Sequence, residues 1–379
     1  MIHPDFSLDG RHYTPAELAH LCRAYLSDQS LPGFERDLYG FLQEWLDERP
    51  DIVVRTSGST ACPKKIRLQK SHMIASARLS GAYFGFHPGQ KALLCLPVRY
   101  IAGKMMIVRA LVWGMDLISS MPQGNPLSGM EDTPVDFTAM VPSQVYSILS
   151  DPATRIKIQR IGILILGGGE VPPDLEAQLR GLPNLIYATY GMTETITHVA
   201  LRRINGEEPA MHYTALPGVR FRQDERGCLV IQAAHLDDEG IFTNDIVDLI
   251  DDAHFHFLGR ADNVINSGGI KLFPEQLERK IARFLTQRYY ITAGSDARLG
   301  QHVVLVIEGE PFDTEDLMAD FRLHLERHEV PREVLFIEAL PESSGGKIRR
   351  IYPQEKSPEQ DTHGFQGRFR QDSNLGPTA

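Results

Sequence analysis

The sequence predicts an α/β protein with a large N-terminal α/β domain that carries a small β-subdomain, followed by a compact C-terminal α+β domain. The length of 379 residues suggests two or three domains, since a domain averages about 150 residues. From Asp51 onward, short apolar runs alternate with helical stretches, and the pattern changes near residue 215 and again after Gly259. A hydrophobic content of 42% and a charged content of 23% are typical of globular proteins and exclude a fully disordered chain.

Residues 14–47 show apolar residues three to four positions apart, which predicts two amphipathic helices. Thr14 followed by Glu17 is a capping-box pattern for the start of the first helix. After Asp51, apolar runs such as KALLCLPV and RIGILILGGG predict strands of a largely parallel sheet. The helical stretches between such runs are residues 70–85, 142–150 and 172–180.

Residues 215–258 contain several short strand patterns separated by turns, which predicts the small antiparallel β-subdomain. The chain beyond it predicts helices over 274–286 and 313–328, and strands near 289–293, 302–308 and 333–337. We therefore divide the chain into an N-terminal domain over 1–258, a C-terminal domain over 259–355 and a polar tail. The tail, residues 356–379, lacks apolar periodicity and is expected to be disordered.

The net negative charge of the chain argues against nucleic acid as a general partner. Lys and Arg number 39 against 49 Asp and Glu, and a net negative chain is a poor general binder of nucleic acid. No run approaches the roughly 18 uncharged apolar residues that a membrane helix needs, so we expect no membrane span. The start of the chain lacks a signal-peptide pattern, and the four cysteines are far apart. A cytoplasmic location is expected.

Residues 56–65 read T-S-G-S-T-A-C-P-K-K and directly follow an apolar strand pattern at 52–54. Hydroxyls, a glycine and two lysines in one short segment supply the N–H and O–H donors and the positive charge that a polyphosphate needs. The segment is not a P-loop, and an ordinary Ser/Thr-rich turn explains it equally well when it is taken alone. The candidate phosphate-binding residues are Thr56, Ser57, Gly58, Ser59, Thr60 and Lys64.

This segment resembles the T-S-G-[ST]-T-G-x-P-K-G loop of the adenylate-forming enzymes, a family that includes acyl-CoA synthetases, peptide-synthetase adenylation domains and luciferases. Two positions depart from the pattern, Ala61 and Lys65, where the family has glycine. If position 61 requires a positive φ, the Cβ of Ala61 costs about 1 kcal/mol and stiffens the loop. We expect this departure to affect the turnover rate more than the fold.

Two further motifs follow in the family's order. Residues 162–170 form an apolar strand pattern that ends in glycines, although a tight strand-to-helix turn would explain it too. The resemblance implies that Gly168, Gly169 and Glu170 line the adenine pocket. The hexapeptide Y-G-M-T-E-T over 190–195 matches the family's most specific motif without a mismatch. It implies Tyr190 and Gly191 beside adenine, Thr193 directed at phosphate and Glu194 as the Mg²⁺ ligand.

The remaining motifs lie in the second half of the chain. Asp245, in the segment F-T-N-D where the family has T-G-D, is implied to accept the ribose hydroxyls. The segment 259–278 matches the family pattern that begins G-R-x-D. It implies Arg260 as a ribose contact, Asp262 as the hinge of a mobile C-terminal domain, and Gly268 and Gly269 at the channel for CoA.

The segment P-E-S-S-G-G-K-I-R-R over 341–350 matches the family's closing pattern. It implies Lys347 as the catalytic lysine, because a mobile ammonium can stabilise charge that develops between the attacking carboxylate and the α-phosphate. The resemblance thus implies ATP, Mg²⁺ and the co-substrate CoA, with Lys347, Glu194 and Thr193 in catalysis. It covers residues 56–350, and the section before the phosphate loop is shorter than in most relatives.

Within the family, the sequence is most similar to the short o-succinylbenzoate–CoA ligases of menaquinone biosynthesis, over the stretches 96–111, 136–146, 190–203 and 259–274. Such a substrate has an aromatic ring, one carboxylate to be activated and one spectator carboxylate. An apolar slot with a cation or hydrogen-bond donors is therefore expected. We expect His198 first and Lys104 second as the acyl-substrate residues. The other candidates are Arg109, Arg202 and Arg203.

Two alternatives stay open. An adenylating enzyme for another aromatic acid, or for a protein-bound acceptor, would use the same ATP residues, and a catalytically weak nucleotide-binding relative would explain Ala61 and the short N-terminal section. The expected partners are a small carboxylic acid, ATP and CoA. A homodimer is possible because dimers are common among soluble enzymes.

Overall fold

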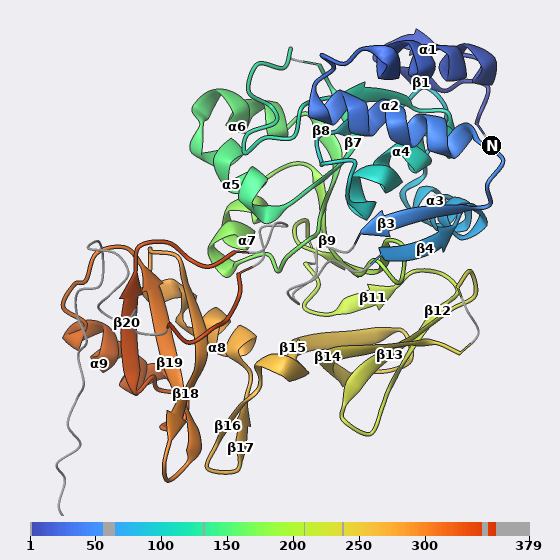
Figure 1. Cartoon of the computed structure of the whole chain (residues 1–379). Coiled ribbons are helices and arrows are strands. Elements are labelled where there is room, and N and C mark those ends of the chain that lie inside the picture. Colours follow the sequence, from blue (N-terminus) through green and yellow to red (C-terminus); the bar gives the residue numbers. More distant parts are fainter. Residues whose placement is uncertain are drawn as a thin grey trace, which may run out of the picture.

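The computed structural model describes residues 2–55, 65–131, 133–207, 209–236, 239–342 and 348–353. Figure 1 shows a large N-terminal part, in which helices cover a long sheet, and a smaller C-terminal part of strands and helices that follows β15. This arrangement confirms the predicted α/β fold class.

The N-terminal section begins with two short strands, β1 (Ser7–Leu8) and β2 (Arg11–His12), and the helices α1 (Pro15–Ser27) and α2 (Gly33–Leu46). The predicted capping box is present at the start of α1. The backbone N–H of Thr14 donates to Oε2 of Glu17 over 2.9 Å, and the N–H of Glu17 donates to Oγ1 of Thr14 over 3.3 Å. These two bonds satisfy donors that the first turn of a helix leaves free.

A sheet of 13 strands forms the centre of the molecule, in the order β12-β13-β14-β15-β11-β10-β9-β8-β7-β5-β6-β1-β2. One half is parallel and contains β5 (Lys91–Leu94), β6 (Asp116–Ser119), β7 (Val135–Met140), β8 (Ile161–Leu166) and β9 (Leu185–Gly191). The other half is antiparallel and contains β10 (His198–Arg203), β11 (Tyr213–Ala215), β12 (Val219–Gln223), β13 (Cys228–Ala233), β14 (Ile241–Leu249) and β15 (His254–Arg260). The predicted antiparallel β-structure is thus continuous with the parallel sheet.

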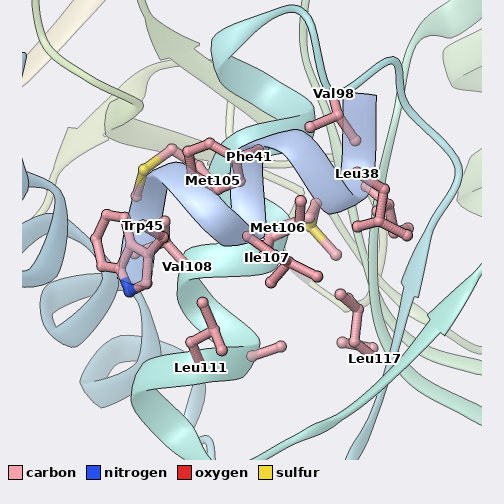
Figure 2. Close-up of a cluster of buried hydrophobic side chains, with 14 of the residues drawn as sticks. Leu38, Phe41, Trp45, Val98, Met105, Met106, Ile107, Val108, Leu111 and Leu117 are labelled. Carbon is pink, nitrogen blue, oxygen red and sulfur yellow. The ribbon is translucent and has the colours of Figure 1, made fainter. Parts of the chain in front are cut away.

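Two cores lie on opposite faces of the parallel half. Side chains alternate along a strand, so Ala92 and Leu94 of β5 join one core while Leu93 and Cys95 join the other. The first core is covered by α1, α2, α3 (Lys70–Phe84) and α4 (Ile101–Trp113). The second is covered by α5 (Pro142–Ser150), α6 (Pro152–Ile158) and α7 (Pro173–Arg180). Figure 2 shows how Phe41 and Trp45 of α2 pack beside α4.

A separate two-stranded sheet precedes α3. The strands β3 (Asp51–Arg55) and β4 (Lys65–Gln69) pair in antiparallel register, with Arg55 opposite Lys65. The predicted phosphate loop is residues 56–65, of which 56–64 lie outside the described residues and Lys65 begins β4.

The C-terminal part contains a five-stranded sheet made of β16 (Ile265–Ser267), β17 (Ile270–Leu272), β18 (Tyr289–Asp296), β19 (Gly300–Glu308) and β20 (Glu333–Ile337). Its helices are α8 (Pro274–Ile281) and α9 (Glu315–His324), with the short 3-10 turns η1 (Ala261–Asn263) and η2 (Ala282–Phe284). Both α-helices are shorter than their sequence patterns indicated. The helix α9 ends because Leu325 turns to an extended conformation and enters the core.

The structure has no helix, within the ranges given above, that is long and apolar enough to cross a membrane.

Candidate active site

The predicted ribose and adenine residues meet where β9 and β15 end, beside the middle of β14. Tyr190 lies near the end of β9, Asp245 lies on β14, and Arg260 ends β15. The phenolic hydroxyl of Tyr190 donates to Oδ2 of Asp245 over 2.6 Å, and Nη1 of Arg260 lies 3.3 Å from Oδ1 of the same carboxylate. Three residues far apart in the sequence therefore form one hydrogen-bonded group.

Burial keeps the phenol of Tyr190 protonated. Tyr190 and Asp245 are both buried, and Tyr190 packs against Phe255 at a ring-centroid distance of 5.0 Å. Burial raises the pKa of Tyr190 well above its ordinary value, and the charge of Asp245 raises it further. The phenol therefore remains a hydrogen-bond donor. Each oxygen of Asp245 has one of these partners, Tyr190 or Arg260, among the described side chains. A carboxylate oxygen accepts two hydrogen bonds, so there is capacity for two ribose hydroxyls.

The predicted hinge residue is linked to the same group. Oδ2 of Asp262 accepts a hydrogen bond from Nη2 of Arg260 over 3.1 Å and lies 3.4 Å from Nδ2 of Asn244. Asn244, which stands where the family pattern has glycine, also accepts from Nη1 of Arg226 over 3.1 Å. The departure from the pattern therefore adds a side-chain contact between β14 and η1.

The predicted adenine loop follows β8. Gly168 has φ of +81°, a conformation that favours glycine. Gly167 lies so close to β9 that a Cβ there would be 2.7 Å from Oγ1 of Thr189. Glu170, at the end of the loop, forms an ion pair with Arg279 of α8 and so joins the loop to the C-terminal part.

The hexapeptide loop is shaped by close packing and backbone strain. A Cβ on Gly191 would lie 2.4 Å from the carbonyl oxygen of Thr197, so only glycine lets β10 approach β9 this closely. Oγ1 of Thr195 accepts from the N–H of Met192 over 2.8 Å. Ile196 is buried and has φ of +68°, which is a strained conformation for a β-branched residue.

Thr193 and Glu194 lie in this loop. Thr193 is half-buried, and its carbonyl accepts from the N–H of Ile196 over 3.0 Å. Glu194 is exposed. The loop therefore presents a hydroxyl and a carboxylate at the surface, between the parallel and antiparallel halves of the sheet.

A second polar group lies deeper in the molecule, around Arg109 of α4 and His198 of β10. Nη2 of Arg109 donates to Oγ1 of Thr197 over 2.7 Å and lies 3.5 Å from Nδ1 of His198. Nε2 of His198 lies 3.4 Å from Oγ of Ser80 on α3. The site thus gathers a guanidinium, an imidazole and two hydroxyls from three elements of the N-terminal part.

Arg109 is buried, and it has no counter-charge among the described residues. It is 2% exposed, its Nε has no hydrogen-bond partner in the described ranges, and no described carboxylate forms an ion pair with it. Burial lowers the pKa of Arg109 to about 10, so it remains charged near neutral pH. Burial, together with the charge of Arg109, lowers the pKa of His198 well below its ordinary value and keeps the imidazole neutral.

Aromatic rings surround this polar group. The guanidinium of Arg109 lies 5.9 Å from the ring centre of Phe137, and the ring of His198 lies 6.2 Å from that of Phe84. The rings of Phe86 and Tyr187 lie 4.7 Å from Phe137 and 5.5 Å from Phe84, respectively. A buried cation lined by aromatic rings suits an aromatic anion.

Lys104 does not join this group. It also lies on α4, but its ammonium lies 4.3 Å above the ring of Phe41 on α2, and burial lowers its pKa. Arg109 follows five residues later, a rotation of about 140° around a helix. The two cations therefore point to different sides of α4, and Arg109 is the one that lies beside His198. The role of Lys104 at the acyl substrate stays a prediction.

Gly268 and Gly269 form the turn between β16 and β17, with φ of +59° and +86°. Two consecutive positive φ angles are typical of a type I′ hairpin, which favours glycine. The turn itself therefore explains the glycine pair, and their role at a CoA channel stays a prediction.

Known proteins resemble this chain in sequence and in fold. The profile of the AMP-binding enzyme family matches residues 46–227. A crystal structure described as an acyl-CoA synthetase (AMP-forming)/AMP-acid ligase II-like protein from Dyadobacter fermentans DSM 18053 is 38% identical to this chain. The match covers 87% of this chain and 95% of that one, with a TM-score of 0.60. The chain belongs to the adenylate-forming, AMP-binding enzyme family.

Two further relatives of this AMP-forming enzyme are informative. A probable 2-succinylbenzoate–CoA ligase of Mycobacterium tuberculosis (strain CDC 1551 / Oshkosh) is 28% identical over 358 residues, which cover 85% of this chain and 88% of that protein. The o-succinylbenzoate coenzyme A synthetase of Bacillus subtilis, solved in complex with ATP and magnesium ion, is 18% identical with a TM-score of 0.68. That match covers 89% of this chain and 81% of the other, and at this identity it supports the fold alone.

The donor set of the AMP-binding enzyme suits a magnesium ion that is held mainly by substrate phosphates. The described ranges contain no group of three or more His, Cys, Asp or Glu residues arranged to hold a metal. Glu194 is a single exposed carboxylate, and Mg²⁺ is usually bound through one or two carboxylates, substrate phosphates and water.

Several expected residues lie outside the described ranges. They are Thr56, Ser57, Gly58, Ser59, Thr60, Lys64 and Lys347. The described residues on either side of Lys347 are joined, since Glu342 and Ile348 form an antiparallel bridge.

Proposed function

We propose that this chain is an ATP-dependent acid–CoA ligase whose acid is o-succinylbenzoate. It would convert o-succinylbenzoate, ATP and CoA to o-succinylbenzoyl-CoA, AMP and pyrophosphate, a step of menaquinone biosynthesis. The observation that carries this proposal is the buried guanidinium of Arg109, which has no carboxylate partner among the described residues and lies among aromatic rings.

A buried cation without a counter-ion is costly, because its desolvation is offset by no opposite charge. A substrate carboxylate would provide that charge and could accept two parallel hydrogen bonds from a guanidinium. The spectator carboxylate of o-succinylbenzoate meets this need, and its ring suits Phe84 and Phe137. The neutral His198 and the Thr197 hydroxyl would add hydrogen bonds to the same carboxylate.

The relatives support the same acid. The Mycobacterium tuberculosis relative bears the name of a probable 2-succinylbenzoate–CoA ligase and aligns over 85% of this chain.

In the first half-reaction, an oxygen of the activated carboxylate attacks the α-phosphorus of ATP, and the bond to pyrophosphate breaks. Tyr190 and the loop at Gly168 would hold adenine, while Asp245 and Arg260 would hold ribose. Lys347 would stabilise the charge that develops at the α-phosphate. Glu194 would hold Mg²⁺, which when bound neutralises phosphate charge, and Thr193 would donate to a phosphate oxygen.

In the second half-reaction, the C-terminal domain, proposed as residues 259–355, turns about Asp262 and withdraws Lys347. CoA enters past Gly268 and Gly269. Its sulfur attacks the acyl carbon as a thiolate, the bond between that carbon and the AMP oxygen breaks, and AMP leaves. Asp262 contacts Arg260 and Asn244, and this rotation would change both contacts.

The test is acid-dependent pyrophosphate release by the purified full chain with ATP and Mg²⁺. The panel contains o-succinylbenzoate, benzoate, a fatty acid and mixed amino acids, each with and without CoA. The expected result is release with o-succinylbenzoate and a CoA thioester product. Activity with a different acid alone would overturn the substrate, and adenylation without transfer to free CoA would favour a protein-bound acceptor.

If no acid of the panel gives pyrophosphate release although ATP still binds, the result would support the alternative of a weak nucleotide-binding relative. Ala61, which replaces a glycine of the family pattern in the phosphate loop, is the observation that motivates this alternative.

A further inference from the structure

A cluster of largely buried charges in the C-terminal part includes Arg350, which lies on the segment that follows Lys347. Arg350 donates from Nε to Oε1 of Glu278 over 3.1 Å and from Nη2 to Oε2 over 2.6 Å. The side chains of both residues are 18% exposed. Two parallel hydrogen bonds between a guanidinium and a carboxylate fix direction as well as distance.

The same guanidinium reaches the hinge through a second carboxylate. Nη1 of Arg350 lies 3.7 Å from Oε1 of Glu275, and that oxygen accepts from Nδ2 of Asn263 over 2.6 Å. Asn263 directly follows Asp262. Burial lowers the pKa of Arg350, but Glu278 and Glu275 more than offset this, so its pKa lies above the ordinary value.

Glu275 lies in a space that only a glycine leaves open. Its side chain is 5% exposed, and a Cβ on Gly259 would be 2.5 Å from Oε2. The cluster therefore packs directly against the end of β15, the last strand before η1.

Side-chain hydrogen bonds also hold residues 350–352 against the sheet. Oγ1 of Thr292 donates to the carbonyl oxygen of Arg350 over 3.2 Å. The hydroxyl of Tyr290 donates to the carbonyl oxygen of Ile351 over 2.7 Å. The hydroxyl of Tyr352 lies 3.1 Å from both carboxylate oxygens of Glu333 on β20. Residues 350–352 are thus held from β18, β20 and α8 together.

We propose that Arg350 is a positioning residue for Lys347. It couples the chain that carries Lys347 to α8 through Glu278, and to the hinge through Glu275 and Asn263, so that these elements turn as one body. This inference rests on the proposed role of Lys347 in adenylation. A loosened anchor would misplace the ammonium, and a displacement of about 1 Å can cost on the order of 100-fold in rate.

The test compares Arg350→Lys and Arg350→Met with the control Arg349→Met. Lysine keeps a positive charge beside Glu278 but cannot make two parallel hydrogen bonds, so this variant avoids leaving the carboxylate without a cation. Arg349 is adjacent and exposed. The two half-reactions are measured separately, as pyrophosphate release with o-succinylbenzoate and as thioester formation from supplied o-succinylbenzoyl-adenylate.

Both Arg350 variants are expected to slow adenylation by at least about tenfold, with the KM for ATP within about threefold, because the ammonium acts mainly in the transition state. Thioester formation is expected to stay within about threefold of wild type. Arg349→Met should resemble wild type in both. An equal loss in both half-reactions would indicate a general structural role and overturn the proposal, as would unchanged adenylation.

A double variant makes the test specific. If Arg350 acts through Lys347, then Lys347→Ala with Arg350→Lys should adenylate no more slowly than Lys347→Ala alone. Additive losses would overturn the proposal. If Lys347→Ala itself adenylates normally, the proposed function fails at that residue, which is a distinct result.

Hydrogen exchange supplies a measurement that needs no substrate. In Arg350→Lys, the backbone amides of residues 348–353 should exchange at least about tenfold faster than in wild type, while those of β5 and β7 stay unchanged. Unchanged exchange at 348–353 would contradict the anchor whatever acid the enzyme uses.

Discussion

The hydroxyl of Tyr190 donates to Oδ2 of Asp245 across 2.6 Å and thereby joins the end of the parallel sheet to β14 of the antiparallel half. Tyr190 reaches this position on β9, four strands away from β14 in the sheet order. The bond links the residue proposed for adenine to the residue proposed for ribose. The two halves of the sheet are therefore held together at the proposed nucleotide site.

Tyr190→Phe tests this link. Phenylalanine keeps the ring that would face adenine but removes the hydroxyl that orients Asp245. We expect the KM for ATP to rise by roughly three- to tenfold and the unfolding free energy to fall by about 0.5–1.5 kcal/mol, the usual net value of one hydrogen bond. Steady-state kinetics and urea denaturation measure these quantities. An unchanged KM would show that Asp245 is oriented without Tyr190.

Arg109→Met tests the acyl site. Loss of the charged contact should raise the KM for o-succinylbenzoate by roughly 30- to 700-fold, corresponding to about 2–4 kcal/mol. Benzoate, which lacks the spectator carboxylate, should bind equally to both proteins. Without substrate the variant should be more stable than wild type, because it removes a buried charge that has no described counter-ion.

Lys104→Met is the matched control for that experiment, since Lys104 lies on the same helix but over Phe41. Its KM for o-succinylbenzoate should remain within about threefold of wild type. A large rise in KM for Lys104→Met but not for Arg109→Met would reverse our assignment of the two cations.

The lowered pKa of His198 leads us to expect a loss of stability in mild acid. Burial and Arg109 lower its pKa in the folded protein, so the folded state binds a proton more weakly than the unfolded chain. The free energy of unfolding should therefore be fully retained above about pH 6.5, the unfolded value, and fall by up to about 1.4 kcal/mol per unit below it. Denaturant titrations from pH 8 to 5 measure this slope.

The slope should be shallower in His198→Asn and unchanged in His20→Asn, because His20 is exposed on α1. Identical slopes in wild type and His198→Asn would show that His198 is not the group responsible.

Ala61→Gly tests the departure in the phosphate loop. A Cβ at a position that needs positive φ costs about 1–2 kcal/mol, so restoring glycine should raise the adenylation rate by no more than roughly 30-fold. Ala61→Ser keeps the Cβ and should not change the rate. A silent wild type that becomes an active ligase only through Ala61→Gly would instead favour the weak nucleotide-binding reading.

Local features of the fold could be predicted from the sequence because they depend on neighbouring residues. The capping box at Thr14 and Glu17 needs contacts over three positions, and the alternation of strands with helices repeats along the chain. The continuity of the sheet could not be predicted, because the pairing of β10 with β9 and β11 with β15 depends on contacts between distant segments.

For the candidate site, the sequence could predict the residues but not the contacts between them. The motifs named Tyr190, Asp245 and Arg260, but their mutual hydrogen bonds required the strand order. The sequence could not show which of Lys104 and Arg109 lies beside His198, for a physical reason. Most of α4 is buried, so its sequence shows no polar face that would reveal which side meets β10. A charged residue within the apolar run M-M-I-V-R-A-L-V-W was the available signal for Arg109.

The positive φ of Ile196 lowers the free energy of unfolding of this enzyme. A left-handed conformation costs an L-residue with a Cβ about 1–2 kcal/mol, whereas a whole domain is stable by only about 5–15 kcal/mol. Ile196, the residue directly after the hexapeptide, thus lowers that free energy by a sizeable fraction. Destabilising substitutions elsewhere in the N-terminal part should therefore release this turn early, and Thr193 and Glu194 would lose their fixed places before the sheet itself unfolds.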